Sequence, residues 1–293
     1  MKINIARSAG FCFGVKRAIT VAQKAADSGA TVHMLGDIVH NEDVVQDISR
    51  AGIKKVRRMG KGHGKYLLIR AHGAPKALFT RAQEAGYEIV DATCPMVREI
   101  HDTAVKAERD GYPLIIIGEK NHDEVRGIIG QLRHKPLVIE SIESIPLARI
   151  ARFTKAAVVV QSTQNLERTL AIIDRLKRYI IDVRFFNTIC NPTRTKQNEI
   201  KKMPLANEVM LIIGSKTSAN TKRLYELSRE LNPRTYWIQK KTDLKPEWFK
   251  KISSVGVTSG SSTPDSTTQE IIAHLKKITG RPHRTPGPRA PRI

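Results

Sequence analysis

Residues 94–118 read CPMVREIHDTAVKAERDGYPLIIIG: a cysteine, a segment with helical spacing of apolar residues, and a strand-like apolar run that ends in glycine. The glycine follows the cysteine by 24 positions, as it does again between Cys12 and Gly36 and between Cys190 and Gly214. A repeat of this length determines the architecture before any single motif does. The sequence therefore predicts three related units, each built from strands and helices.

Each unit also carries polar side chains after its strand-like runs. The first set, four residues past each glycine, is His40, His122 and Ser218; the second set, near the end of the next apolar run, is His72, Ser162 or Thr163, and Ser262. In parallel sheets, ligands bind beyond the carboxyl ends of the strands. We therefore expect both sets to face one centre if the three units close into a ring.

The cysteines of the chain are Cys12, Cys94 and Cys190, one per repeat. An odd number of distant cysteines disfavours structural disulfides. None of the three lies in a CxxC pair, so a structural zinc site is also disfavoured. Three converging thiolates suit an iron–sulfur cluster, which normally takes four cysteines, so one iron would keep an open site for a substrate oxygen. The alternative is that the repeat preserves a niche for a small buried side chain.

Alternating strand and helix patterns predict an α/β protein of three pseudo-threefold related, trefoil-like units around a central iron–sulfur cluster. We expect unit boundaries at residues 14–96, 97–192 and 193–279, with the N-terminal strand, residues 1–13, joining the third unit. Residues 280–293 are rich in proline and arginine without apolar periodicity, and we expect them to form a disordered basic tail.

The polar positions predict a pocket for a compact polyanion such as a diphosphate. Imidazoles supply charge-assisted donors, and small hydroxyl and amide residues before a helix, as in residues 215–220 and 259–262, bind phosphate well. Glu124, two residues past His122, is a candidate proton donor if it is buried, and residues 161–164 offer a hydroxyl that bridges it to substrate. The alternative for Glu124 is an exposed residue at a helix start.

The chain of 293 residues has 50 basic and 28 acidic side chains and a net charge of +22. Basic clusters such as residues 54–58 and 201–202 are spread along the chain without interleaved aromatic residues. We interpret them as solvated helix faces and loops; a docking face for an acidic electron carrier is the second interpretation, and nucleic-acid binding is disfavoured. No apolar run reaches a membrane span and no signal-peptide core begins the chain, so we expect a cytoplasmic protein without membrane contact.

Taken together, these strings resemble the IspH/LytB family, the 4-hydroxy-3-methylbut-2-enyl diphosphate reductases of the methylerythritol phosphate isoprenoid pathway. The resemblance runs from about Ile3 to Lys277. Its motifs, in order, are GFCFGVKRA at 10–18, HN at 40–41, AHG at 71–73, DATCP at 91–95, HDEV at 122–125, NTIC at 187–190, GSK at 214–216 and GVTSG at 256–260.

The resemblance implies a three-lobed α/β fold around one oxygen-sensitive 4Fe–4S cluster, held by Cys12, Cys94 and Cys190 with an open iron site. It implies that Glu124 delivers protons, aided by the hydroxyl of Ser162 or Thr163. The residues implied to hold the diphosphate are His40, His72, His122, Ser218, Asn220 and Ser262. An allylic diphosphate would then lose its hydroxyl as water to give isopentenyl and dimethylallyl diphosphate, with electrons from an acidic donor such as ferredoxin or flavodoxin.

Three positions depart from the family pattern. Asp123 stands where proline is common, and we expect it to loosen that turn. Ser162 stands where threonine is usual and keeps the hydroxyl, so we expect little loss. Ala219 replaces a frequent serine, so one phosphate contact there would be made by backbone alone or be absent.

Two other functions compete with this interpretation. A cluster-dependent hydro-lyase would use the same open iron to dehydrate a carboxylate substrate, but it calls for arginines, and we expect none at the matched strand ends. An iron–sulfur sensor would use the basic surface to bind nucleic acid with a steep salt dependence.

Overall fold

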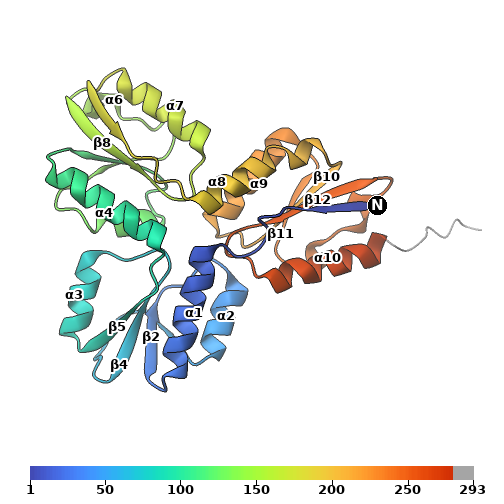
Figure 1. Cartoon of the computed structure of the whole chain (residues 1–293), viewed down its shortest axis with the longest axis horizontal. Coiled ribbons are helices and arrows are strands. Elements are labelled where there is room, and N and C mark those ends of the chain that lie inside the picture. Colours follow the sequence, from blue (N-terminus) through green and yellow to red (C-terminus); the bar gives the residue numbers. More distant parts are fainter. Residues whose placement is uncertain (280–293) are drawn as a thin grey trace, which may run out of the picture.

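The computed structural model describes residues 1–279, which form three four-stranded parallel sheets with helices packed beside them (Figure 1). The sheets belong to three lobes that spread from a common centre. This arrangement confirms the predicted α/β class with three related units. The predicted tail, residues 280–293, lies outside the described residues.

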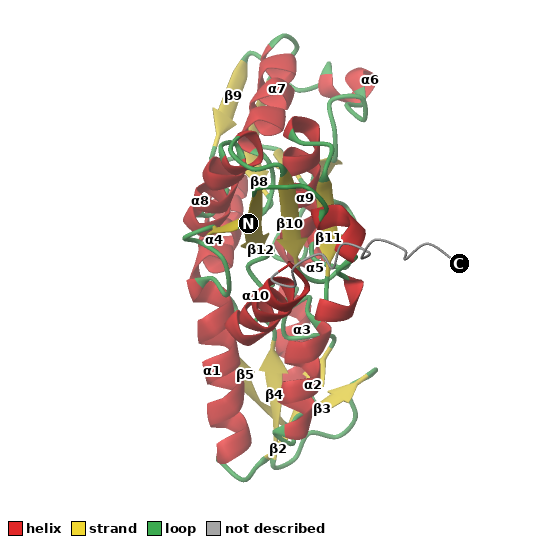
Figure 2. Cartoon of the chain, turned by 90° about the vertical axis from the view of Figure 1, so that its right-hand side faces the viewer, coloured by secondary structure: helices red, strands yellow, loops and turns green. Residues whose placement is uncertain are grey.

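The first lobe has the strand order β3-β2-β4-β5. Its elements are α1 (Phe13–Asp27), β2 (Thr31–Leu35), α2 (Glu42–Arg50), β3 (Lys54–Val56), β4 (Lys65–Ile69), α3 (Lys76–Glu84) and β5 (Tyr87–Asp91). Successive residues of β4 face opposite sides: Leu68 packs into the core beneath α1 and α2, and Leu67 packs with Ala82 of α3. Figure 2 shows α1 and α3 on either side of β4.

The second lobe has the strand order β7-β6-β8-β9. Its elements are α4 (Pro95–Arg109), β6 (Leu114–Ile117), α5 (Asp123–Ile129), β7 (Leu137–Ile139), α6 (Leu147–Ile150), β8 (Lys155–Val160), α7 (Leu166–Lys177) and β9 (Asp182–Phe185). Every residue of β6 is buried because helices cover both faces of this sheet, which explains its uninterrupted apolar sequence.

The third lobe has the strand order β1-β12-β10-β11, so the first strand of the chain joins the last sheet. Its elements are β1 (Lys2–Ile5), α8 (Asn191–Ile200), β10 (Val209–Ile213), α9 (Ala219–Leu231), β11 (Thr235–Ile238), β12 (Ser254–Ser259) and α10 (Asp265–Thr279), with short 3-10 turns at Met203–Leu205, Lys241–Asp243 and Pro246–Phe249. Ile3 pairs with Val255 and Ile5 with Val257.

The chain passes from one lobe to the next at each cysteine. The backbone N–H of the cysteine donates to a carbonyl of the lobe being left, and the helix that follows packs in the lobe being entered. The three bonds are Cys94 to Ala71 (3.0 Å), Cys190 to Ser162 (3.1 Å) and Cys12 to Ser261 (3.1 Å). All three crossings therefore lie where the lobes meet.

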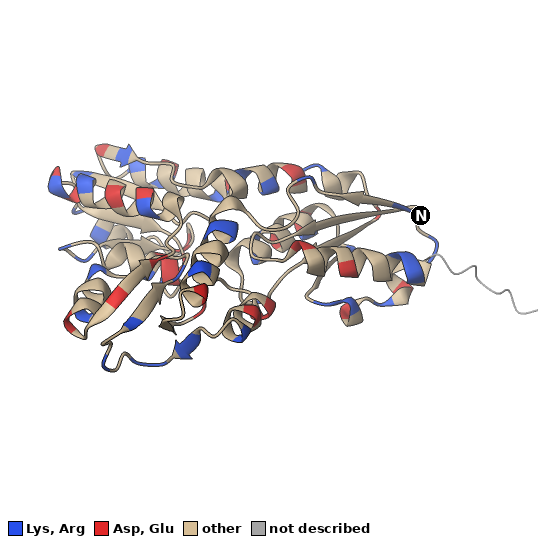
Figure 3. Ribbon diagram, turned by 60° about the horizontal axis from the view of Figure 1, so that its bottom comes forward, with Lys and Arg blue, Asp and Glu red and all other residues tan. Residues whose placement is uncertain are grey.

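One basic cluster differs from its prediction. Lys54–Val56 is not a helix face or loop but the edge strand β3, with both lysines exposed. Exposed lysines on a short edge strand oppose pairing with another chain, so the charge suits the position. Lysine and arginine lie on all three lobes among acidic residues rather than on one face (Figure 3). Within residues 1–279, no helix combines the length and apolarity needed to cross a membrane.

Candidate functional site

One pocket at the meeting point of the lobes brings the predicted site residues together. Its lining includes the three cysteines, the three histidines, the glutamate and the small polar residues, namely Cys12, Cys94, Cys190, His40, His72, His122, Glu124, Ser162, Thr163, Ser218, Asn220 and Ser262. They come from segments spread between positions 12 and 262, and they share one surface only because the lobes close around a centre.

Each cysteine is the N-cap residue of a long helix. Cys12 precedes α1, Cys94 precedes α4 and Cys190 precedes α8, all with non-helical backbone angles. The helix N-terminus favours a negatively charged sulfur, because the unpaired N–H groups and the macrodipole carry partial positive charge. The repeat in the sequence is thus a repeat of three thiols at three helix starts.

The thiols are free and partly buried. Burial raises the pKa of Cys94, and it raises the pKa of Cys190 to about 11 despite the hydrogen bond from its Sγ to Thr193 Oγ1. The charges of Cys12 and Glu124 act in the same direction on both. The thiols of Cys94 and Cys190 are therefore protonated at neutral pH, and a metal that binds to them must displace their protons.

Gly14 separates two of the thiols. A Cβ added at this position would lie 2.5 Å from Cys94 Sγ and 3.9 Å from Cys12 Sγ. Both sulfur atoms therefore lie within a few ångströms of one point, and the absence of a side chain at Gly14 keeps that space open.

We expect Gly14→Ala to abolish stable metal binding while leaving the α/β fold intact, because the added methyl group occupies the space beside two thiols. The measurement is iron and sulfide content after anaerobic reconstitution. Gly60→Ala is the matched control, since a Cβ at Gly60 meets nothing within 4 Å. Equal iron content in the two variants would contradict this account of Gly14.

The three histidines form one cluster on the polar side of the pocket. The ring centroids of His40 and His72 lie 4.3 Å apart. The ring centroid of His122 lies 5.3 Å from that of His40 and 5.6 Å from that of His72. Burial lowers the pKa of all three, that of His122 to about 4. His122 Nδ1 accepts the N–H of Glu124 at 3.1 Å, so the proton of the neutral ring sits on Nε2 and stays available as a donor.

Several lining atoms are buried without a hydrogen-bond partner in residues 1–279: His40 Nε2, His72 Nδ1, and both Nδ2 and Oδ1 of Asn220. A buried polar atom without a partner costs about 1–3 kcal/mol, so native proteins rarely leave them. Their concentration in one pocket indicates a polar ligand. Ser218 adds the N-cap of α9, another helix start that favours an anion.

Glu124 is buried, with 2% of its surface exposed, which rejects the alternative of a solvated helix-start residue. Its Oε1 accepts the backbone N–H of Ser162 at 2.5 Å and its Oε2 accepts the Ser162 hydroxyl at 2.7 Å. Burial raises the pKa of Glu124 above its usual range, while the two bonds from Ser162 oppose that rise. The carboxyl group therefore keeps its proton to a higher pH than an exposed glutamate does.

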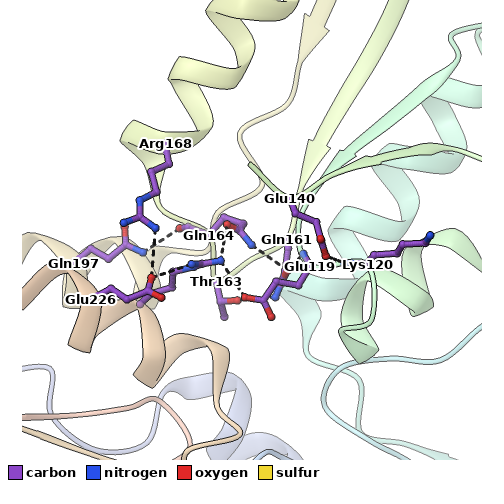
Figure 4. A network of polar contacts seen from close by, with 10 residues as sticks. Glu119, Lys120, Glu140, Gln161, Thr163, Gln164, Arg168, Gln197 and Glu226 are labelled. Carbon is purple, nitrogen blue, oxygen red and sulfur yellow. Dashed lines mark hydrogen bonds and ion pairs between the residues drawn. The ribbon is translucent and has the colours of Figure 1, made fainter. Parts of the chain in front are cut away.

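Thr163 belongs to a different set of contacts, which Figure 4 shows. Its hydroxyl accepts from Gln161 Nε2 at 3.0 Å, and Gln161 Oε1 accepts the backbone N–H of Glu119 at 2.9 Å. Arg223 of α9 then pairs with Glu119 at 3.0 Å. This network ties the loop after β8 to the third lobe and thereby fixes the position of Ser162.

Asp123, which we expect to loosen its turn, makes polar contacts with the first lobe. Its carboxylate pairs with Arg70 at 2.6 Å and lies 3.8 Å from His40 Nε2, and it joins the second lobe to the first. Arg70 corrects another expectation, because it directly follows β4 and so places an arginine at a strand end. Its guanidinium is engaged by Asp123, and it does not line the pocket.

The family model described as LytB protein matches residues 3–276. The chain belongs to the LytB family. Two curated LytB relatives are named 4-hydroxy-3-methylbut-2-enyl diphosphate reductase: that of Aquifex aeolicus is 38% identical over 280 residues, covering 94% of this chain and 96% of the relative. That of Geotalea uraniireducens is 37% identical over 278 residues, covering 95% and 98%.

Two solved structures agree. One is (E)-4-hydroxy-3-methyl-but-2-enyl diphosphate reductase, described as the terminal enzyme of the non-mevalonate pathway; it has a TM-score of 0.71 at 37% identity and covers 94% of this chain and 100% of its own. The other, the E-1-hydroxy-2-methyl-but-2-enyl-4-diphosphate reductase from Plasmodium falciparum, has a TM-score of 0.86 at 25% identity, covering 94% and 88%.

Sequence reasoning missed part of this LytB pocket. The missed lining residues are Gly14, Val15, Val39, Ala71, Met96, Val97 and Thr193. Most are small or apolar, and nothing in their type separates them from core residues. Thr193 had a usable signal, since it lies in the first turn of the helix that starts at Cys190 and so faces the same helix end.

Proposed function

We propose that the chain is a 4-hydroxy-3-methylbut-2-enyl diphosphate reductase that converts its substrate to isopentenyl and dimethylallyl diphosphate. The observation that carries the proposal is one pocket lined by three free thiols, a buried carboxyl group and a polar set with unpartnered buried atoms. Such a pocket suits a redox centre, a proton source and a diphosphate. LytB relatives of nearly full length carry this name.

The LytB family is a family of iron–sulfur enzymes. Cys12, Cys94 and Cys190 would hold a 4Fe–4S cluster, and three free thiols at three helix starts, beside the space that Gly14 leaves, fit that group. When bound, the cluster supplies electrons and, at the iron without a cysteine, a Lewis acid for the substrate oxygen.

The diphosphate would bind to His40, His72, His122, Ser218, Asn220 and Ser262. His40 Nε2 and Asn220 Nδ2 lack partners in the described residues, and an anionic ligand would satisfy them. The apolar residues Val15, Val39 and Val97 line the same pocket, and they suit the five-carbon chain because they exclude water from it. Substrate orientation is then fixed at both ends.

Glu124 would deliver the proton that lets the allylic oxygen leave as water. Hydroxide is a poor leaving group, so breaking the C–O bond calls for proton transfer. The Ser162 hydroxyl lies 2.7 Å from Glu124 Oε2 and is the nearer relay of the two hydroxyls considered, since Thr163 bonds to Gln161. The reaction takes up two electrons and two protons, breaks one C–O bond and releases one water.

The electrons would come from an acidic carrier such as ferredoxin or flavodoxin. The net charge of +22 favours attraction of an acidic protein over distances comparable to the Debye length. Because the basic residues lie on all three lobes, charge alone does not select one docking face (Figure 3).

Diphosphate binding is expected to take up protons. The pKa values of His40, His72 and His122 lie below the ordinary value of 6.5 in the free protein, so these rings are neutral at pH 7. An anion beside them raises their pKa values, so affinity should rise as the pH falls from about 7.5 to 6. Calorimetry of inorganic pyrophosphate binding in buffers of different ionisation enthalpy measures the uptake. An uptake equal in wild type and His122→Asn would contradict the assignment.

The experiment that tests the proposal is anaerobic turnover of 4-hydroxy-3-methylbut-2-enyl diphosphate by the reconstituted protein. Consumption should require a reduced low-potential dye and give two isomeric five-carbon diphosphates. Consumption without the dye would contradict a reductase, because no electrons would be needed. No consumption by a protein with an intact cluster would reject the proposed reaction and favour the sensor or the hydro-lyase.

A further inference from the structure

Lys196, on α8, is a buried cation that the proposed reaction does not use. Only 3% of its surface is exposed, and in residues 1–279 no carboxylate oxygen lies within 4.0 Å of its Nζ. Its Nζ donates to the carbonyl oxygens of Ser8, of Gly10 at 3.2 Å and of Ser259 at 3.0 Å. A buried charge is costly unless an opposite charge lies near it, so this ammonium group calls for an anion.

The surroundings of Lys196 place that anion at the cysteines. Ser8 and Gly10 belong to the loop that leads into Cys12, and α8, which carries Lys196, starts at Cys190. A negative charge at Cys12 would favour the ammonium form of Lys196 more than the charges of Glu199 and Asp265 do. Lys196 therefore links the backbone around one proposed cluster ligand to the helix of another.

A second residue of α8 holds the same loop. Glu199 accepts the backbone N–H of Arg7 at 3.0 Å and that of Ser8 at 3.1 Å, and it also accepts the Ser8 hydroxyl. Lys196 and Glu199 thus anchor one loop with opposite charges. This pair makes it possible to separate the effect of charge from the effect of loop position.

We propose that Lys196 is a positioning residue that supplies the buried countercharge of the iron–sulfur cluster and thereby makes the cluster easier to reduce. The inference rests on the proposed function, because it needs a cluster at Cys12, Cys94 and Cys190. Reduction adds negative charge, and a fixed cation in a medium of low permittivity stabilises the reduced state more than the oxidised one. Net charge and hydrogen bonding are known determinants of cluster potentials.

The protonation of Lys196 is compatible with this role. Burial lowers its pKa to about 8, so the ammonium form still predominates at pH 7. A bound anionic cluster beside it favours the same form.

The test is an anaerobic redox titration of the reconstituted full chain, followed by absorbance and electron paramagnetic resonance. We expect Lys196→Met to make one-electron reduction about tenfold less favourable, a fall of 59 mV in potential. Lys196→Arg keeps the charge and should stay close to wild type. Lys202→Met, which removes an exposed lysine just past the same helix, is the matched control and should leave the potential unchanged.

Glu199→Gln decides between charge and loop position. If the charge near the cluster determines its reduction potential, removing the negative charge of Glu199 should raise that potential. If the position of the loop determines it, the loosened loop should lower the potential, as in Lys196→Met. A wild-type potential in Lys196→Met, or a fall in Glu199→Gln as large as in Lys196→Met, would overturn the inference.

Two further outcomes remain decisive. If Lys196→Met does not retain a cluster, the titration is repeated with Lys196→Gln. Loss of the cluster in both neutral variants, with retention in Lys196→Arg, would support the role of the positive charge. Loss of the cluster in Lys196→Arg as well would contradict that role. A wild-type protein that holds no cluster would refute the proposed function itself, whereas a wild type with cluster and turnover but unchanged variant potentials would refute only the role of Lys196.

Discussion

Glu124→Gln is expected to lower turnover by about 10²- to 10⁴-fold while the protein keeps its cluster. The amide has nearly the shape of the carboxyl group, but it cannot supply the proton that the leaving oxygen needs. The buried carboxyl group of Glu124 accepts hydrogen bonds only from Ser162 in the described residues. Among those residues no other carboxyl group lines the pocket, so none can take its place. Anaerobic kcat and iron content are measured on the same sample.

The matched control for this variant is Glu143→Gln, the same chemical change on an exposed residue of the second lobe. It should have wild-type kcat and iron content. Wild-type turnover in Glu124→Gln would exclude Glu124 as the proton source, and loss of iron would show that the carboxylate instead supports the metal site.

Cys190→Ser is expected to leave the protein folded but without a stable cluster. Serine keeps the hydrogen bond with Thr193, but its hydroxyl is a much poorer ligand for iron–sulfur centres than a thiolate. With two thiols left, the cluster should be lost during desalting. Iron and sulfide content and the visible absorbance check this loss, and far-ultraviolet circular dichroism checks the fold.

A full complement of iron and sulfide in Cys190→Ser would contradict the assignment of three thiolate ligands. We also expect Cys12→Ser and Cys94→Ser to lose the cluster, because the three cysteines make equivalent backbone hydrogen bonds. A cluster that is retained with only two of the three cysteines would contradict the threefold arrangement of ligands.

The central strands of the fold could be predicted because burial on both faces leaves a strong apolar signal. Residues 114–117 and 211–213 became the inner strands β6 and β10, and the strand-like start of the chain became β1. The edge strand β3 could not be predicted, because its lysines are exposed and its three residues show little apolar periodicity. Whether such a short segment forms a strand depends more on the neighbouring strand it pairs with than on its own sequence.

The polar part of the site could be predicted because the repeat marked equivalent strand ends. The sequence alone does not decide whether Ser162 or Thr163 supplies the hydroxyl of the proposed proton path. The backbone bond from Cys190 to the Ser162 carbonyl matches those from Cys94 to Ala71 and from Cys12 to Ser261. Thr163 is therefore the counterpart of His72 and Ser262, while Ser162 is the residue that contacts Glu124.

The roles of Gly14 and Lys196 depend on distances between lobes, which no local pattern contains. Gly14 is proposed to matter because two thiols lie close to the position that a Cβ would take there. Lys196 is proposed to matter because its ammonium group reaches the backbone carbonyls of Gly10 and Ser259, which are distant in the sequence. Glycines and lysines are frequent, so the residue type alone carried no signal.

The most direct test of the account is a crystal structure of the anaerobically reconstituted protein with substrate, using anomalous scattering at the iron absorption edge. The account predicts iron density in the pocket between Cys12, Cys94 and Cys190, with the diphosphate against the histidine cluster. Iron bound by fewer than these three sulfur atoms, or located elsewhere in the molecule, would contradict the proposed site.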